Sequence, residues 1–257
     1  MVNLQTDYRG IIKELIQLQA ENPAYSLLQF QSLVSAFQYA RLYNLFLEFV
    51  PEGSRVLDWG AGNGHFSYFL LRSGYRTSAY GMEDHLLPEL LKKQYPGFEY
   101  VRGKENEPVK LPYPDKSFEA VTSVGVLEHV REMKGDEVAS LFEIKRVLKP
   151  GGIFICYHFP NRYSLIEAVS KLFPSKHHHQ FKYDKTNIAE LCSQSGFEIL
   201  KLERYSFLPR NMWGRFPQII RNSEIVSQGW NALDRVLSGP FNPFCQNYLF
   251  VARKPGS

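Results

Sequence analysis

A carboxylate followed by three alternate glycines is the part of the chain whose residue types and spacing point most directly to ligand chemistry. The segment reads D-W-G-A-G-N-G and runs from Asp58 to Gly64. Residues 55–57 before it are typical of a parallel strand that is buried on both faces. The glycines allow the backbone to turn sharply and to approach a ligand closely, and Asn63 or the turn beside it can cap a helix that begins near His65. The sequence therefore predicts a ligand site at a strand–turn–helix junction.

The charge of Asp58 narrows the choice of ligand. Dinucleotide sites use the spacing G-x-G-x-x-G and place a pyrophosphate at the N-terminus of the helix. This chain has G-x-G-x-G, and Asp58 lies two residues before the first glycine, where a negative charge repels a pyrophosphate. The same charge attracts S-adenosylmethionine (SAM), which carries an ammonium and a sulfonium group and no phosphate. Spacing and charge favour SAM over a nicotinamide dinucleotide, and an NAD-dependent oxidoreductase is the less favoured alternative.

The segment D-W-G-A-G-N-G resembles motif I of the class I SAM-dependent methyltransferases, and further motifs follow in the order of that family. They are Gly81-Met82-Glu83 at the end of a second expected strand, L-P-Y-P-D-K-S-F-E-A-V-T-S at residues 111–123, V-L-E-H-V at residues 126–130 and R-V-L-K-P-G-G-I-F-I at residues 146–155. The resemblance covers roughly residues 50 to 200 and is greatest to the methyltransferase type 11 group. It implies an enzyme that uses SAM and releases S-adenosyl-L-homocysteine.

The resemblance also implies which residues bind the cofactor. The motif I residues in this set are Asp58, Gly60, Ala61, Gly62 and Gly64. Glu83 ends the second strand, where the family has a carboxylate that binds both ribose hydroxyls, and a carboxylate can accept two hydrogen bonds from a cis-diol. Adjacent Asp84 is the rival for this role, and a solvated acidic turn is the alternative without function. Ser123 and Val124, at the end of the fourth strand, are expected to line the SAM pocket, and Glu105 is expected on the adenine side.

Histidines are the candidate general bases, because an imidazole titrates near neutral pH. His129 follows the fourth strand, beside the expected methyl group, and ranks first. His178 or His179 ranks next, because related enzymes often place a substrate-side histidine in this region. His158 ends the fifth strand and is a further candidate. For each histidine a packing or solvated role is the alternative, and a carboxylate acceptor would need no base.

No metal is expected at this site. In ubiquinone-pathway O-methyltransferases and small-RNA 2′-O-methyltransferases, the pattern E-x-x-E-H binds a divalent ion, and Glu128-His129 matches its end. The first glutamate of the pattern falls at Gly125, so one ligand is missing. The histidine run at residues 177–179 could supply another ligand, which makes a metal the minor alternative.

Strand and helix patterns alternate along the chain, which predicts a parallel sheet that is covered on both faces. Beyond the first strand at residues 55–57, strands are expected at residues 77–82, 99–101, 119–123, 152–158, 197–207 and 248–253, and helices at 10–20, 26–49, 65–73, 86–95, 136–148, 164–173 and 186–195. The family resemblance implies an α/β, Rossmann-like fold with a seven-stranded, mostly parallel sheet in the order 3-2-1-4-5-7-6. Ligands bind at the carboxyl ends of such strands, where the strand order reverses, and the candidate cofactor residues at the strand ends fall on that edge.

The segments outside the core are expected to recognise the acceptor. One globular domain is expected, made of an N-terminal helical lid (1–50), a SAM-binding core (51–204), an aromatic cap insertion (205–245) and the last strand and tail (246–257). Residues 205–245 are too long for a plain hairpin. The aromatic and arginine residues in and beside this insertion are Phe207, Trp213, Phe216, Trp230, Phe241, Phe244, Arg204, Arg210, Arg215 and Arg221. They favour a hydrophobic acceptor that carries an acidic group, although plain packing on the sheet is the simpler role for the aromatic residues.

Composition predicts a globular enzyme rather than a membrane or nucleic-acid-binding protein. Of the 257 residues, 44% are hydrophobic and 22% charged, and neither an apolar run that could span a bilayer nor a signal-peptide pattern is present. Three widely spaced cysteines and the SAM requirement indicate a cytoplasmic location. The net charge of +4 comes from dispersed basic residues, so no nucleic-acid partner is expected. The function expected is methyl transfer to an oxygen, of a hydroxyl or a carboxylate, on a hydrophobic or natural-product-like small molecule, with RNA or a peptide as the alternative substrate.

Overall fold

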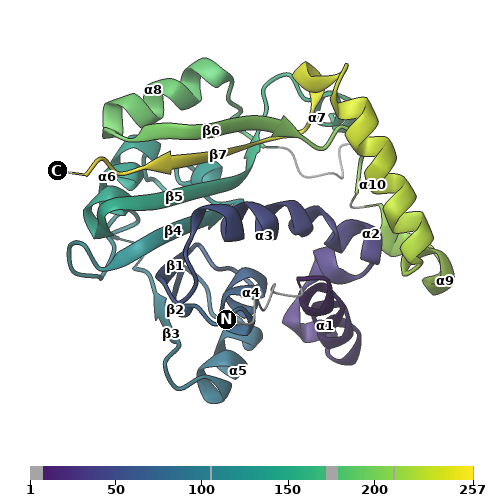
Figure 1. Ribbon diagram of the computed structural model, residues 1–257, viewed down its shortest axis with the longest axis horizontal. Coiled ribbons are helices and arrows are strands. Elements are labelled where there is room, and N and C mark those ends of the chain that lie inside the picture. Colours follow the sequence, from purple (N-terminus) through teal and green to yellow (C-terminus); the bar gives the residue numbers. More distant parts are fainter. Residues whose placement is uncertain (1–7, 105, 172–178, 211, 257) are drawn as a thin grey trace.

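A seven-stranded mixed sheet forms the centre of the molecule (Figure 1). The computed structural model describes residues 8–104, 106–171, 179–210 and 212–256. The strand order is β3-β2-β1-β4-β5-β7-β6, which confirms the predicted fold class. The strands are β1 (Arg55–Trp59), β2 (Arg76–Gly81), β3 (Glu99–Arg102), β4 (Phe118–Val124), β5 (Leu148–Pro160), β6 (Glu198–Tyr205) and β7 (Asn247–Arg253). Strand β7 runs antiparallel to both β5 and β6, and the other neighbours are parallel.

The register of the sheet places the expected site residues at one edge. Strand β1 lies between β2 and β4, and Asp58 is level with Ala79 on one side and Thr122 on the other. All of β1 after Arg55 is buried, as its apolar sequence predicts for a central strand. The strand order reverses between β1 and β4, and sheets of this order have their ligand crevice at that point, outside the carboxyl ends of the strands, which is where the glycine turn lies here.

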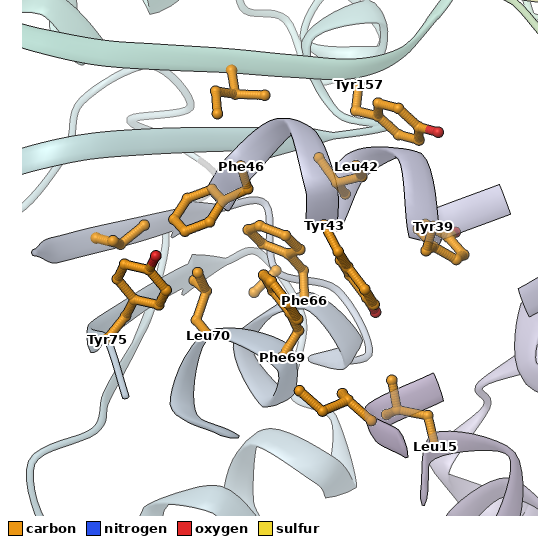
Figure 2. Close-up of a cluster of buried hydrophobic side chains, with 14 of the residues drawn as sticks. Leu15, Tyr39, Leu42, Tyr43, Phe46, Phe66, Phe69, Leu70, Tyr75 and Tyr157 are labelled. Carbon is orange, nitrogen blue, oxygen red and sulfur yellow. The ribbon is translucent and has the colours of Figure 1, made fainter. Parts of the chain in front are cut away.

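Helices cover both faces of the sheet. The helices α3 (Gln38–Phe49), α4 (His65–Arg72) and α5 (Leu86–Gln94) contribute to one apolar cluster, and α6 (Glu137–Val147) and α8 (Lys185–Ser195) contribute to the other. Figure 2 shows the first cluster, in which aromatic rings of α3 lie against α4. The rings of Tyr43 and Phe69 stack at 3.9 Å, and Phe46 meets Tyr75 edge-on at 4.9 Å. These contacts fix α3 across the sheet, above the strands that carry the glycine turn.

The prediction of a single helix at residues 26–49 is wrong. The chain there forms a 3-10 turn η2 (Leu28–Phe30), a short helix α2 (Leu33–Ala36) and then α3. Ser32 is extended, with a φ of −146°, and its side chain accepts a hydrogen bond from the backbone N–H of Ser35, so a new helix begins after it. The short turn η1 (Pro23–Tyr25) separates this segment from α1 (Tyr8–Glu21). The breaks bring α1 and α2 round to the carboxyl edge of the sheet instead of continuing the line of α3.

The insertion before β7 contains η4 (Trp213–Arg215), α9 (Gln218–Arg221), α10 (Glu224–Ser238) and η5 (Asn242–Phe244). Helix α10 packs beside α2, so this insertion lies next to the N-terminal helices (Figure 1). The side-chain hydroxyl of Ser35 donates to the backbone oxygen of Arg210 at 2.7 Å, and Lys13 pairs with Glu224 at 2.6 Å. Helix α7 (Leu165–Ser170) follows β5. Among the described helices, none combines the length and apolar character needed to cross a bilayer.

Candidate active site at the carboxyl edge of the sheet

At two positions of the turn between β1 and α4, the backbone conformation and the surrounding packing fit only glycine. Gly60 and Gly64 have φ angles of 76° and 81°. A Cβ on Gly60 would lie 2.3 Å from a methyl group of Val126, and a Cβ on Gly64 would lie 2.9 Å from Pro88. At Gly62, by contrast, the nearest atom to such a Cβ is 3.9 Å away, so the middle of the turn faces open space. The turn is tightly packed at its two ends and open between them, as a cradle for a ligand requires.

Backbone hydrogen bonds hold the turn against β2. The N–H groups of Gly60 and Ala61 both donate to the carbonyl oxygen of Tyr80, at 2.8 and 2.9 Å. From the other direction, Asn63 donates its side-chain amide to the backbone oxygen of Ser26 at 3.0 Å. Of the two caps that the sequence leaves open, Asn63 or the turn beside it, the structure has the turn, because Gly64 is the cap residue of α4. The N-terminal segment is instead hydrogen-bonded to the turn through Asn63.

Asp58 is buried beneath the turn. Its side chain is 1% exposed, and its Oδ2 accepts a hydrogen bond from the hydroxyl of Ser67 at 2.6 Å. Burial raises the pKa of Asp58 to about 7, against the opposing effect of the hydrogen bonds from Ser67. The carboxyl group is thus poised between its neutral and charged forms near neutral pH. A cationic ligand above the turn would favour the carboxylate and would bind more tightly to it.

The carboxylates after β2 have different surroundings. The Glu83 side chain is 82% exposed, with the imidazole of His85 3.8 Å away. Its backbone oxygen accepts a hydrogen bond from the hydroxyl of Tyr100, which fixes the main chain at this point. The rival Asp84 forms an ion pair with Arg102 at 2.6 Å. The exposed carboxylate of Glu83 therefore fits a ribose diol better than that of Asp84.

The residues at the end of β4 differ in exposure. Ser123 is fully buried and lies level with Cys156 of β5, whereas Val124 is partly exposed. Val126 touches the glycine turn, so the end of β4 and the turn after β1 line the same crevice. The roles of Ser123 and Val124 in binding SAM stay predictions, as do those of the glycine turn and Glu83. Glu105 and His178 lie outside the described residues.

A buried carboxylate and two imidazoles meet just after β4. Glu128 and His129 lie in the 3-10 turn η3 (Leu127–His129), and Glu128 is 2% exposed. Burial raises the pKa of Glu128 to about 8. The ring of His129 is 5.6 Å from that of His179, which precedes α8. The structure therefore brings together two of the histidines that the sequence indicates, and adds Glu128, whose burial next to them no sequence pattern reveals.

His158 and His65 lie on the side of the crevice that faces α3. The ring of Tyr39 is 4.5 Å from His65 and 5.5 Å from His158. Burial lowers the pKa of each histidine to about 3, so both imidazoles are neutral at pH 7. His158 has a φ of 67°, and its Nδ1 lies 2.9 Å from the hydroxyl of Tyr205. His65 was not a candidate from the sequence, because nothing in its local pattern separates it from an ordinary core residue.

The crevice suits SAM on two structural grounds. A Cβ would clash at Gly60 and at Gly64, so the turn presents bare backbone to a ligand. Next to it, a buried carboxyl at Asp58 and an exposed carboxylate at Glu83 match a ligand with a cationic amino-acid end and a ribose. We infer from this fit that the adenosyl moiety extends along the end of β2 and that the sulfonium end lies towards η3.

Comparison with known proteins gives the class to which this chain belongs. A family model described as a methyltransferase domain matches residues 34–202. A demethylmenaquinone methyltransferase of Tropheryma whipplei (strain Twist) is 26% identical over 178 residues, which are 62% of this chain and 72% of that protein. A fatty-acid O-methyltransferase of Mycolicibacterium smegmatis is 34% identical over 120 residues, 45% of this chain and 41% of that protein. The crystal structure of a SAM-dependent methyltransferase from Archaeoglobus fulgidus matches with a TM-score of 0.56 and 21% identity, covering 85% of this chain and 93% of that one.

The chain belongs to the methyltransferase domain family. It is a class I SAM-dependent methyltransferase, as the fold, the family match and the relatives together show. Its cofactor is SAM.

Proposed function

We propose that the protein transfers the methyl group of SAM to an oxygen atom of a hydrophobic small molecule, and that this oxygen lies beside Glu128, His129 and His179. The observation that carries the proposal is the meeting of a buried carboxylate with two imidazoles at the end of β4. Such groups can take a proton from a hydroxyl acceptor as it is methylated. A carboxylate acceptor would need no base and would use the same groups for orientation.

The protein's own residues have three tasks in this reaction. Bound SAM supplies an electrophilic methyl group, so the protein mainly aligns the partners and excludes water. Asp58 places negative charge under the glycine turn, and Glu83 accepts the hydrogen bonds of the ribose diol. His129 then takes the proton of the acceptor hydroxyl, and Glu132, whose Oε2 lies 2.9 Å from Nδ1 of His129, orients the ring. His179 is the alternative base, with Glu167 2.9 Å from its Nδ1. His178, the third candidate base, stays a prediction.

A cleft beside the rim is the proposed place for the rest of the acceptor. It has a volume of about 1070 Å³ and lies between α3, β6 and α10. Tyr157 and Tyr205 line it, and the hydroxyl of Tyr205 also contacts His158 at the rim. Arg41 and Arg204 lie in its wall, where they suit an acidic group on the acceptor. The residues expected to form a lid and a cap both contribute to this cleft, which supports a substrate-recognition role for them.

The named activities of the relatives support a hydrophobic acceptor. One acts on demethylmenaquinone and another on a fatty acid, and both compounds have long apolar parts. The two relatives act on different kinds of compound, so the choice of oxygen as the methylated atom is our proposal.

The basic residues of the cleft include Arg41, which pairs with Glu203, and Arg210, which pairs with Asp234. Because carboxylates already pair with these two arginines, the cleft has less free positive charge than binding to the phosphates of an RNA requires. Location in the cytoplasm is likewise part of the proposal.

Labelled SAM tests the proposed function directly. The purified protein is incubated with methyl-labelled SAM and, in separate reactions, with long-chain fatty acids, reduced quinones, total RNA and a peptide mixture. We expect the label in an organic-soluble product, as an ester that base hydrolyses or as a base-stable ether. Label in RNA or in peptide would contradict the proposal, and so would methylation at carbon or nitrogen of the small molecule. The Glu83→Ala variant, with weakened SAM binding, is the matched control for enzyme-dependent transfer.

A further inference from the structure

Glu128, His129 and His179 are arranged as metal ligands are. One potential ligand atom from each lies within 4.8 Å of those of the other two. Among these atoms, Oε1 of Glu128 and Nε2 of His129 are 3.9 Å apart. Tetrahedral ligands at about 2.1 Å from a zinc ion are about 3.4 Å from one another. Small rotations of the side chains would therefore bring the three groups onto one ion.

The imidazoles are oriented by carboxylates in the way that metal-bound histidines are. Nδ1 of His129 lies 2.9 Å from Oε2 of Glu132, and Nδ1 of His179 lies 2.9 Å from Oε1 of Glu167. A carboxylate at Nδ1 fixes the tautomer and the ring plane and makes the other nitrogen, Nε2, a better ligand. Two histidine–carboxylate pairs therefore lie beside the carboxyl group of Glu128, which is the arrangement of a metal site with its supporting residues.

Glu128 provides an independent indication of a missing cation. Its Oε2 is buried and has no hydrogen-bond partner within the described part of the chain. Buried polar atoms generally have a hydrogen-bond partner or an ion, so a buried carboxylate oxygen without a partner in the chain calls for an ion or a water molecule. The oxygen belongs to the residue whose carboxyl group lies within 4.8 Å of a ring nitrogen of each imidazole, so a cation bound to the three residues would satisfy it.

We propose that Glu128, His129 and His179 bind one divalent transition-metal ion, with zinc as the best fit. Two imidazoles and one carboxylate are the ligand set of catalytic zinc sites, which keep a fourth position open. Magnesium prefers six oxygen ligands, so this set disfavours it. The inference departs from the expectation drawn from the sequence, because His179 supplies a ligand 50 residues after His129 along the chain.

Gly125 shows why the sequence pattern E-x-x-E-H is incomplete here. This residue has a φ of 70°, a conformation that side-chain-bearing residues rarely adopt. A Cβ at this position would lie 3.7 Å from Oε1 of Glu128 and 3.9 Å from Cβ of His158. The backbone conformation therefore disfavours a glutamate at Gly125, so the ligand that the pattern has at this position must come from elsewhere in the chain or from solution.

The role of the ion rests on the proposed function, whereas its binding does not. An acceptor hydroxyl in the open position would lose its proton to solvent more readily, because a bound cation lowers the pKa of an oxygen ligand. The acceptor oxygen then forms a bond to the methyl carbon as the carbon–sulfur bond breaks, and the electron pair of that bond stays on sulfur. With the ion bound, His129 and His179 would hold it, and the proton that the proposed function gives to His129 would go to solvent instead.

Zinc titration of the metal-free, full-length protein tests the inference without any enzyme assay. Calorimetry with Zn²⁺, and separately with Mg²⁺, is applied to the wild type and to Glu128→Gln, His129→Ala and His179→Ala. We expect one zinc ion per chain and a weakening of about 100-fold or more in each variant. Glu132→Gln and Glu167→Gln, which change positioning residues, should weaken binding by about tenfold. Circular dichroism and the dissociation constant for SAM show that each variant is folded.

A double variant separates this site from the neighbouring run of histidines. His177→Ala combined with His178→Ala keeps all three proposed ligands and should bind zinc within about threefold of the wild type. Failure of the wild type to bind one zinc ion, or wild-type affinity in Glu128→Gln, would overturn the inference. Loss of zinc binding in the double variant but not in the single-ligand variants would overturn the inference as well, because the zinc site would then be the histidine run at residues 177–179. Methyl transfer to RNA would contradict the proposed function and leave the zinc result standing.

Discussion

Replacing Gly60 by alanine is expected to damage the cofactor site through two separable effects. The first is backbone strain, since Gly60 has a φ of 76° and a non-glycine residue in this region costs about 1–2 kcal/mol. The second is overpacking, because the added Cβ would lie 2.3, 2.5 and 2.9 Å from three side-chain atoms of Val126. Overpacking of this kind typically costs about 1–3 kcal/mol. The free energy of unfolding should therefore fall by about 2–5 kcal/mol.

Gly53 offers a matched control for the strain alone. Its φ is 74°, almost equal to that of Gly60, and a Cβ there would meet no atom within 4 Å. Gly53→Ala should therefore cost only the backbone term of about 1–2 kcal/mol. It should also leave SAM affinity unchanged, because Gly53 precedes β1 at the opposite end of the strand from the glycine turn.

Val126→Ala in the Gly60→Ala background tests the clash itself. This change removes the atoms at 2.3 and 2.5 Å and leaves the contact at 2.9 Å, so part of the lost stability and SAM affinity should return. Urea unfolding followed by circular dichroism gives the free energies, and calorimetry gives the dissociation constant for SAM. Equal losses in Gly60→Ala and Gly53→Ala, with no recovery on changing Val126, would refute the packing argument.

The remaining predictions concern charges in and beside the cofactor crevice. Asp58→Asn should weaken SAM binding about tenfold or more, since one unit of log affinity is about 1.4 kcal/mol, and should stabilise the SAM-free protein above neutral pH. The pKa of Asp58 is about 7 in the folded protein against an ordinary value of 3.8, so the free energy of unfolding of the wild type should fall as pH rises between these two values. The stability advantage of the variant should grow over the same range to at most about 4 kcal/mol, which urea unfolding at each pH would show. Glu83→Ala should weaken SAM binding about 10- to 100-fold, as expected for lost hydrogen bonds to a charged group, with Asp84→Asn as a control that changes calorimetric affinity little. His129→Ala should lower kcat by about 10²- to 10⁴-fold in the methyl-transfer assay and leave the SAM dissociation constant within about threefold.

Each of these predictions has an outcome that contradicts it. A stability difference between Asp58→Asn and the wild type that does not change between pH 4 and pH 7 would mean that Asp58 keeps its ordinary pKa of 3.8. A larger loss of SAM affinity in Asp84→Asn than in Glu83→Ala would reverse the assignment of the ribose ligand. Unchanged kcat in His129→Ala would leave His179 as the remaining described candidate.

The fold was predictable because its signals are local. The apolar strand before Asp58, the glycine turn and the later strand-end motifs each occupy a few consecutive residues, and their order along the chain matches a known topology. The break at Ser32 was missed, because apolar residues at helical spacing continue across it. A side-chain cap on the N–H of Ser35 decides that break, and serine is too common within helical patterns to reveal it.

The candidate site was only partly predictable. Asp58, Glu83 and His129 stand next to strand ends, so their sequence position indicates the carboxyl edge. The approach of His179 to Glu128 depends on how the chain after β5 returns to the rim, which is a tertiary contact without a local signal. The burial of Glu128, which raises its pKa to about 8, likewise follows from the surrounding packing and not from the residues beside it in the chain.

A structure of the protein with S-adenosylhomocysteine bound tests the central claim most directly. We expect the ligand over the glycine turn, with both ribose hydroxyls about 3 Å from the carboxylate of Glu83 and the sulfur atom facing η3. S-adenosylhomocysteine in the cleft between α3, β6 and α10, with the glycine turn vacant, would contradict it.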